Sequence, residues 1–272
     1  MQATVNIPMS APKFSANLSM MFQEVPFMER FAAAAEAGFK AVEFMFPYDY
    51  PLADLQNVLS SNGLDFVLIN LPAGDFASGE RGIAGNPARQ SEFRAGVDRA
   101  IEYAQGLGVK QVNCLVGKTW SDVPMVEQRR VMVENLRFAA EALAAKNIRL
   151  LVEPLNSRDV PGFFLDTTTT KVFSILDEVA HPNAYLQYDV YHAQRMEGEL
   201  TGILKENLPR ISHIQIADNP GRHQPGTGEI NYRWLLAEFL AMGYTGYIGL
   251  EYVPMPDSIG SLGWLCDYGY WS

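Results

Sequence analysis

The chain has 272 residues, of which 48% are hydrophobic and 19% are charged, and its formal net charge is −10. This apolar content excludes a disordered chain, and no apolar run reaches the roughly 18 residues that a membrane helix needs. An acidic balance without a Lys/Arg cluster argues against nucleic acid as a partner, so we expect a globular protein of one large domain or two small ones.

Eight short runs rich in β-branched and aromatic residues alternate with longer amphipathic stretches. The runs begin 24 to 46 residues apart, which leaves room for a helix in every gap. They are FSANLSM from Phe14, AVEFM from Ala41, DFVLIN from Asp65, QVNCLVG from Gln111, LLVEPL from Leu150, LQYDV from Leu186, ISHIQIA from Ile211 and YIGLEYV from Tyr247. This alternation predicts a (β/α)8 barrel, and an open, doubly wound sheet is the competing architecture.

The gaps carry helix signals. Pro26 opens the segment PFMERFAAAAEAGF, and Gly38 stands where a C-terminal stop belongs. The segments from Pro87 to Gly108 and from Pro124 to Lys146 are also predicted helices. In the first of them, one apolar stripe at helical spacing is formed by Phe93, Val97, Ala100, Ile101 and Ala104. No low-complexity linker divides the chain, so we predict a single domain.

Two connections are unusually long and polar. PAGDFASGERGIAGNPAR follows the third predicted strand, and DNPGRHQPGTGEINY follows the seventh. Both come after the carboxyl ends of strands, the face where barrel enzymes keep their active sites. Loops of this length in a compact domain are more often functional than merely connecting.

Four consecutive predicted strands each carry one oxygen-bearing side chain near the carboxyl end: Glu153, Asp189, Gln215 and Glu251. Three acids converging on one barrel mouth would repel one another without a cation between them. Because oxygen ligands favour hard ions, these four residues predict a site for a divalent metal, Mg²⁺ or Mn²⁺. Glu43, at the end of the second strand, is either exposed or only a hydrogen-bond partner.

Other residues near these strand ends can serve a substrate. His192 lies three residues after Asp189, Lys118 follows the fourth strand, and Arg222 lies in the loop after the seventh. An acidic protein that binds an anion needs local positive charge, so we predict that these three residues bind substrate. His213 points to the same face as Gln215 but one layer deeper, and we assign it to the core.

Several long motifs resemble one family. FSANLSMMF, VEFMFPYDY, NLPAGD, GERGIA, NCLVGK, VEPLN, QYDVYHAQRMEGEL, QIADNPGRHQPGTGEINY and the closing EY are similar to the hydroxypyruvate isomerase family, which belongs to the xylose-isomerase-like barrels. The resemblance covers nearly the whole chain from Phe14 to about Trp264 and implies one (β/α)8 domain over residues 13–272. Residues 1–12 lie outside it as an N-terminal extension.

The resemblance implies an intramolecular oxidoreductase that interconverts hydroxypyruvate and 2-hydroxy-3-oxopropanoate (tartronate semialdehyde). It assigns Glu153 and Glu251 as proton donor and acceptor, acting through an enediolate, and it assigns the same four metal ligands. A metal-assisted hydride shift is the rival path. The wider sugar-epimerase branch has His where this chain has Gln215, and an amide ligand favours Mg²⁺ or Mn²⁺.

Two alternative functions stay open. A sister family, the 2-oxo-tetronate isomerases, shares FANL, FPY, GEINY and the ligand set, so a four-carbon acid or a related keto acid or ketose is the second candidate. A barrel that binds a small acid without turning it over is the third, although a plain binder has little need of four converging oxygen ligands.

The remaining expectations concern location and assembly. Two cysteines, Cys114 and Cys266, cannot form a disulfide framework. No basic residue precedes Lys13, so the N-terminus does not resemble a secretory signal, and we expect a cytoplasmic protein. We expect no nucleic-acid or membrane partner. The aromatic C-terminal tail, WLCDYGYWS, can either cover the barrel or form an interface in a homo-oligomer.

Overall fold

Nine parallel strands form one sheet in the computed structural model, which describes residues 11–271. The expected N-terminal extension therefore lies outside the described residues, except for its last two positions. The strands are β1 (Lys13–Asn17), β2 (Ala41–Glu43), β3 (Asp65–Phe66), β4 (Ile69–Asn70), β5 (Gln111–Cys114), β6 (Arg149–Val152), β7 (Ala184–Asp189), β8 (Ile211–Ile216) and β9 (Tyr247–Leu250).

The sheet closes into a barrel through its third predicted strand. In the strand order β3-β2-β1-β9-β8-β7-β6-β5-β4, the two outermost strands are β3 and β4, which only two residues separate in the chain. The first half of this segment pairs with β2, and the second half pairs with β5. Between them the amide of Val67 still donates to the carbonyl of Val42, at 2.9 Å. The predicted (β/α)8 barrel is confirmed, and the open sheet is excluded.

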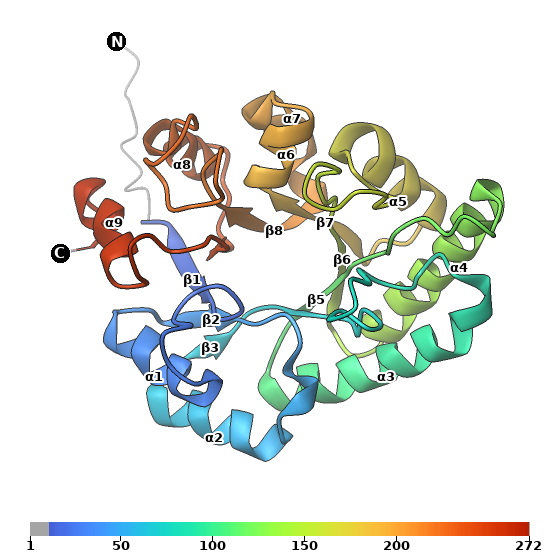
Figure 1. Ribbon diagram of the computed structural model, residues 1–272, viewed down its shortest axis with the longest axis horizontal. Helices are drawn as coiled ribbons and strands as arrows, with labels where there is room; N and C mark the ends of the chain where they lie inside the picture. Colours follow the sequence, from blue (N-terminus) through green and yellow to red (C-terminus); the bar gives the residue numbers. More distant parts are fainter. Residues whose placement is uncertain (1–10, 272) are drawn as a thin grey trace, which may run out of the picture.

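Helices surround the curled sheet in a ring (Figure 1). They are α1 (Phe27–Glu36), α2 (Leu52–Asn62), α3 (Gln90–Leu107), α4 (Met125–Ala144), α5 (Phe173–Val179), α6 (Val190–Met196), α7 (Leu200–Asn207), α8 (Tyr232–Ala241) and α9 (Gly263–Asp267). Gly38 and Gly108 end α1 and α3 with positive φ angles of 104° and 72°, a conformation that glycine adopts without a steric penalty. Within residues 11–271, none of these helices combines the length and apolar character that crossing a bilayer requires.

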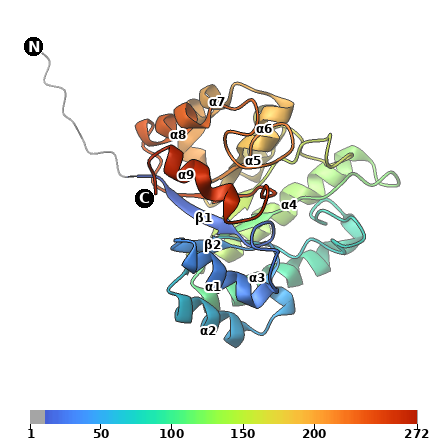
Figure 2. The same ribbon diagram turned by 60° about the vertical axis from the view of Figure 1, so that its left-hand side comes forward.

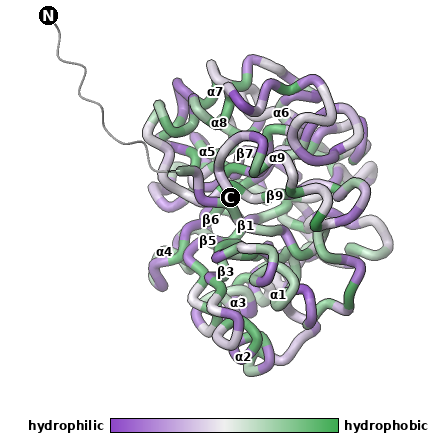
Figure 3. Tube along the Cα trace, turned by 90° about the vertical axis from the view of Figure 1, so that its left-hand side faces the viewer, coloured by the Kyte–Doolittle hydropathy of each residue, from purple (hydrophilic) through white to green (hydrophobic). Residues whose placement is uncertain are grey.

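The helices hold the barrel by their apolar faces. On α3, Phe93, Val97, Ala100 and Ala104 of the predicted stripe are buried, and Ile101 is half-buried. Figure 3 shows hydrophobic segments concentrated at the strands in the centre of the trace. This burial is the main source of the free energy that stabilises the fold, and it keeps the strand ends in fixed relative positions.

The aromatic C-terminal tail covers the barrel. The ring of Trp264, on α9, meets Phe14 of β1 edge to face at 5.4 Å, and Trp271 meets Phe39 in the same way at 5.0 Å. Figure 2 shows α9 lying beside β1. Of the two roles expected for this tail, covering the barrel is confirmed, and a homo-oligomer stays a prediction.

Candidate active site

A cavity of about 270 Å³ opens at the carboxyl ends of the strands. Polar side chains line it from around the ring, and they include Asn17, Glu43, Asn70, Glu153, Gln215 and Glu251. Both long loops reach it, the first through Phe76 and Arg81 and the second through Arg222. The predicted location of the site, at the carboxyl face beneath these loops, matches this cavity.

The four predicted metal ligands converge at this face. Asp189 ends β7 and is paired in register with Gln215 of β8, while Glu153 and Glu251 directly follow β6 and β9. All four residues are at most 4% exposed. Glu153, Gln215 and Glu251 line the cavity, and Asp189 borders it through its contacts with Arg222 and His192.

Arg222 lies between two of the acids. Its Nη2 is 3.3 Å from Oδ2 of Asp189 and 3.2 Å from Oε1 of Glu251. Burial acts to lower the pKa of Arg222, but the surrounding carboxylates, Glu251 and Asp189 first, outweigh it and raise the pKa above the ordinary value. The guanidinium group is therefore a permanent positive charge inside the acidic cluster.

A buried aspartate shapes the loop that carries Arg222. The carboxylate of Asp218 accepts hydrogen bonds from the backbone amides of Gly226, Gly228 and Ile230, at 2.9 to 3.1 Å. These bonds fold the long segment back on the end of β8. Arg222 itself has a φ of 57°, a left-handed conformation that an arginine rarely adopts, and the surrounding loop holds it there.

The acidic cluster has more carboxyl groups than the single charge of Arg222 can balance when they are ionised. Burial, with the nearby charge of Asp189, raises the pKa of Glu153 to about 8, and burial raises the pKa of Asp189 to about 6. Burial also raises the pKa of Glu251 well above its ordinary value. Three buried carboxyl groups around one guanidinium group would be brought to neutrality by one divalent cation, so the residues present fit such an ion.

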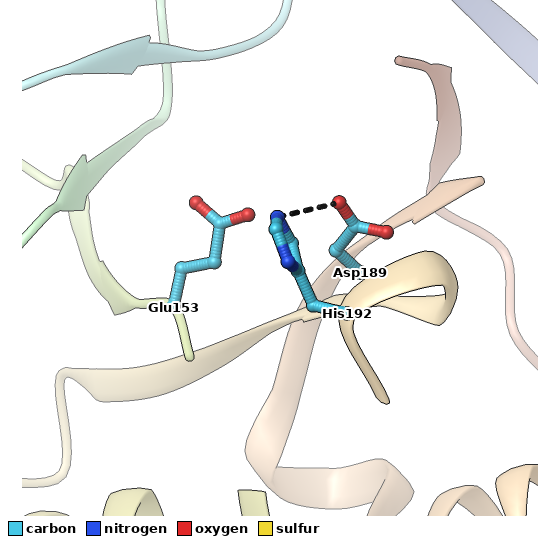
Figure 4. A group of neighbouring side chains, drawn as sticks. All are labelled: Glu153, Asp189 and His192. Atoms are coloured by element: carbon cyan, nitrogen blue, oxygen red, sulfur yellow. Dashed lines mark ion pairs between the residues drawn. The ribbon is translucent and has the colours of Figure 1, made fainter. Parts of the chain in front are cut away.

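Glu153, Asp189 and His192 bring one ligand atom each within 4.8 Å of one another, a spacing that can hold a metal ion. Figure 4 shows the imidazole of His192 between the two carboxyl groups. Its Nδ1 accepts a hydrogen bond from the backbone amide of Asn156 at 3.0 Å, which leaves the ring proton on Nε2, 3.5 Å from Oδ2 of Asp189. Burial lowers the pKa of His192 well below 6.5, so the neutral ring acts as a hydrogen-bond donor.

Glu43 is buried and has four hydrogen-bond donors around it. Its carboxylate accepts from the side chains of Ser15, Asn17, His213 and Gln215, at 2.7 to 3.1 Å. Burial would raise the pKa of Glu43, but its interactions with His213 and these other donors hold it below the ordinary value. Of the two readings of Glu43, the hydrogen-bond partner is confirmed, and so is the placement of fully buried His213 in the core.

The cavity lining contains Arg81, which was not among the predicted substrate-binding residues, and does not contain Lys118. Lys118 pairs with Phe163 in an isolated bridge, and its side chain is not among the described side chains that line the cavity, whereas Arg81 of the first long loop is. The substrate-binding role of Lys118 stays a prediction. The sequence analysis missed Arg81 as a residue of the cavity. Its position as a cation inside GERGIA, in a long loop after a strand, was the signal that could have identified it.

Three strand-end amides were also missed. Asn17 and Asn70 line the cavity, and Nδ2 of Asn113 donates to Oε2 of Glu153 at 2.8 Å. All three stand among apolar neighbours in FSANLSM, DFVLIN and QVNCLVG. The signal that identified the three acids and Gln215 on strands five to eight would have found these amides on the first, third and fourth predicted strands.

Comparison with known proteins agrees with this fold. Residues 31–268 match the family model described as a xylose isomerase-like TIM barrel. The chain is 51% identical to the hydroxypyruvate isomerase of Escherichia coli (strain K12), over 94% of this chain and 99% of that one. It is 44% identical to the 2-oxo-tetronate isomerase of Cupriavidus necator, over 94% and 98% of the two chains.

Among solved structures, a crystal structure described as an AP endonuclease of family 2, from Brucella melitensis, superposes with a TM-score of 0.91. It is 42% identical and covers 94% of this chain and 99% of its own. An L-ribulose 3-epimerase, at 22% identity and a TM-score of 0.73, shares the fold over 89% of this chain and 82% of its own. The chain therefore belongs to the xylose isomerase-like TIM barrel family, in the group that contains the hydroxypyruvate and 2-oxo-tetronate isomerases.

Proposed function

We propose that this protein is an isomerase that interconverts hydroxypyruvate and 2-hydroxy-3-oxopropanoate. The observation that carries the proposal is the pair of buried carboxyl groups, Glu153 and Glu251, on the wall of one small cavity. Moving a carbonyl between adjacent carbons needs a group that removes a proton from one carbon and a group that returns a proton to the other. The 51% identity to the Escherichia coli hydroxypyruvate isomerase supports the three-carbon acid as substrate.

The proposal includes a divalent metal, Mg²⁺ or Mn²⁺, held by Glu153, Asp189, Gln215 and Glu251. Such an ion, when bound, polarises the substrate carbonyl and makes the adjacent C–H bond more acidic. The excess of buried carboxylates over Arg222 supports it. His192 is the remaining neighbour of this set, and its Nε2 proton suits it to donate a hydrogen bond to a substrate oxygen.

Each proposed proton-transfer group has one oxygen held and one oxygen available. Oε2 of Glu153 accepts the hydrogen bond of Asn113, and Oε1 of Glu251 pairs with Arg222. These contacts fix both carboxyl groups, and each would use one oxygen for the metal and the other for proton exchange with the substrate. One carboxylate removes a proton from C3, which leaves an enediolate, and the other delivers a proton to C2. The hydroxyl proton on the C3 oxygen passes to the C2 oxygen, so that the carbonyl moves from C2 to C3. His192 and Arg222 orient the substrate oxygens.

A second candidate is the isomerisation of a 2-oxo-tetronate. The 2-oxo-tetronate isomerase of Cupriavidus necator is 44% identical over nearly its whole length, which favours the same chemistry on a four-carbon acid. The two candidates differ in substrate length and not in the reacting carbons. Relative rates on the two acids therefore separate them.

The test is turnover of hydroxypyruvate by the purified protein before and after EDTA, with Mg²⁺ or Mn²⁺ then restored. We expect 2-hydroxy-3-oxopropanoate to form only with the metal present. Faster turnover of a 2-oxo-tetronate would transfer the proposal to the four-carbon acid. A folded, metal-loaded protein that turns over neither acid would contradict both and favour a binding protein.

A further inference from the structure

We propose that Arg81 binds the carboxylate of the substrate and thereby makes the cavity select small acids over uncharged sugars. The inference rests on the proposed function, because it names the residue that recognises the acid group of that substrate. It concerns the loop after β4, on which no other reacting or metal-binding group has been placed.

The first argument is the availability of positive charge. Arg222 lines the cavity, but its positive charge is offset by Asp189 and Glu251, which lie 3.3 and 3.2 Å from its Nη2. Arg81 lines the same cavity and has no carboxylate within ion-pair distance among the described residues. Its neighbour Glu80 is paired with Arg89 at 2.5 Å instead. Of the two arginines that line the cavity, Arg81 is therefore the one whose charge no carboxylate of the described residues offsets.

The second argument is the geometry of the guanidinium group. Nη1 of Arg81 donates to the carbonyls of Phe76 and Glu80 at 3.0 and 2.7 Å, and the group stacks on the ring of Phe76 at 3.8 Å. Phe76 in turn packs against Phe46, at 4.9 Å between ring centroids. Nε and Nη2 donate to nothing in the described part of the chain. Two parallel donors on a fixed plane match the two oxygens of a carboxylate.

The third argument is that the backbone beside Arg81 is rigid. The amide of Gly82 donates to Ala73 at 2.9 Å, and the amide of Ala84 donates to Val116 at 3.1 Å, so the loop is tied to the segment after β5. A Cβ at Gly82 would lie 1.7 Å from the carbonyl oxygen of Leu115, so only glycine allows this approach. The position of Arg81 is thus fixed before a ligand binds.

The fourth argument is electrostatic. A substrate acid entering this cavity meets Glu153, Glu251 and the neighbouring Asp189, which repel its carboxylate. Arg81, a cation that lines the same cavity and forms no ion pair with these carboxyls, attracts the acid group instead. Because the cavity is partly shielded from water, one ion pair there is stronger than on the surface. Burial lowers the pKa of Arg81 from its ordinary value, in keeping with its partial shielding from water.

The experiment compares kinetics and binding in three variants. Arg81→Gln removes the charge, and Arg81→Lys keeps the charge but loses the pair of parallel N–H donors. Arg94→Gln is the control, since Arg94 is an exposed arginine stacked on Phe138 outside the cavity. For hydroxypyruvate we expect Arg81→Gln to raise KM by about 10- to 100-fold, with a smaller change in kcat. The KM of Arg81→Lys is expected to lie between those of Arg81→Gln and the unaltered protein. The KM of Arg94→Gln should equal that of the unaltered protein.

A matched pair of inert ligands separates recognition from loop disorder. Glycerate has a carboxylate where glycerol has a hydroxymethyl group and is otherwise the same. Calorimetry on EDTA-treated protein compares their affinities. The unaltered protein should prefer glycerate, and Arg81→Gln should lose that preference while its affinity for glycerol is kept. If Arg81 had only a structural role, Arg81→Gln would bind both ligands more weakly by the same factor, and the proposal would be overturned. An unchanged preference for glycerate in Arg81→Gln, or no binding of glycerate by the unaltered protein, would overturn it as well.

The two proposals fail in different ways. An unaltered protein that turns over no acid would contradict the proposed function, and the glycerate comparison would still decide the role of Arg81. Turnover of hydroxypyruvate with an unchanged KM in Arg81→Gln would leave the function standing and overturn the inference.

Discussion

Nε2 of Gln215 donates a 2.7 Å hydrogen bond to Oε1 of Glu43, deep in the mouth of the barrel. A carboxylate accepts and cannot donate, so this bond fixes which end of the amide faces Glu43. Oε1 of Gln215 is thereby turned away, where it accepts a hydrogen bond from Gln187 at 2.6 Å and keeps a second lone pair. Glu43 thus decides that an oxygen, and not an NH₂ group, is presented to the proposed metal.

Replacement of Glu43 by Gln should therefore weaken metal binding. A glutamine side chain can both donate and accept, so the amide of Gln215 would no longer have one preferred orientation. We expect a loss of about 10- to 100-fold in Mn²⁺ affinity, the usual effect of removing a partner of a metal ligand. Competition with a fluorescent chelator measures it.

Ser15→Ala is the control for Glu43→Gln. It removes one donor to Oε2 of Glu43 and leaves the bond to Gln215 in place, so it should change Mn²⁺ affinity much less. Equal affinities in Glu43→Gln and the unaltered protein would contradict the orienting role.

Gly249→Ala tests the space that Glu43 needs. A Cβ at Gly249 would lie 2.5 Å from Oε1 of Glu43, so the buried carboxylate must shift away from its donors. We expect the free energy of unfolding to fall by about 1 to 3 kcal/mol in denaturant titrations. Gly263→Ala is the control, because a Cβ at that position meets no atom within 4 Å. Equal free energies of unfolding in Gly249→Ala and Gly263→Ala would contradict the predicted clash between a Cβ at position 249 and Glu43.

Glu153→Gln and Glu251→Gln test the proposed proton transfers. Each change removes the group that exchanges a proton but keeps its shape, and we expect kcat to fall by about 10²- to 10⁴-fold. Glu134→Gln, on the exposed face of α4, controls for loss of a glutamate. Circular dichroism should show that all three variants are folded. Near-normal turnover in either Glu153→Gln or Glu251→Gln would refute the assignment of that residue.

Binding of the metal should release protons. Because burial raises the pKa of Glu153 to about 8 and that of Glu251 well above its ordinary value, the metal-free site holds protons at pH 7. A divalent cation binds the ionised carboxylates, so its affinity should increase as the pH rises from about 6 to 8. Calorimetry in two buffers of different ionisation enthalpy counts the protons. An enthalpy independent of the buffer would contradict the raised pKa values.

The fate of the migrating hydrogen separates proton transfer from a hydride shift. If Glu153 and Glu251 carry the proton, a reaction run in D₂O should place deuterium at C2 of the 2-hydroxy-3-oxopropanoate formed. A direct shift between the two carbons would retain the original hydrogen. Mass spectrometry of the product after a single turnover distinguishes the two paths, and a product free of deuterium would refute proton transfer.

Much of the site was predictable because strand periodicity is local. A charged residue among apolar neighbours at a strand end, such as Glu153 or Asp189, must find a partner inside the barrel. Parallel strands bring their carboxyl ends to one edge, so the convergence of the acids followed without coordinates. The same pattern at Asn17 and Asn70 would have extended the prediction to the other half of the ring.

The sequence by itself determined the barrel and the acidic face, because apolar periodicity and the order of strands depend on neighbouring residues alone. Only the tertiary structure decided which cation is paired and which is open, since Arg222 and Arg81 lie on different loops and their partners are distant in the chain. It also decided the role of Glu43, whose donors Ser15 and Gln215 come from β1 and β8. Such contacts depend on how loops and strand faces meet in space, which no local pattern encodes.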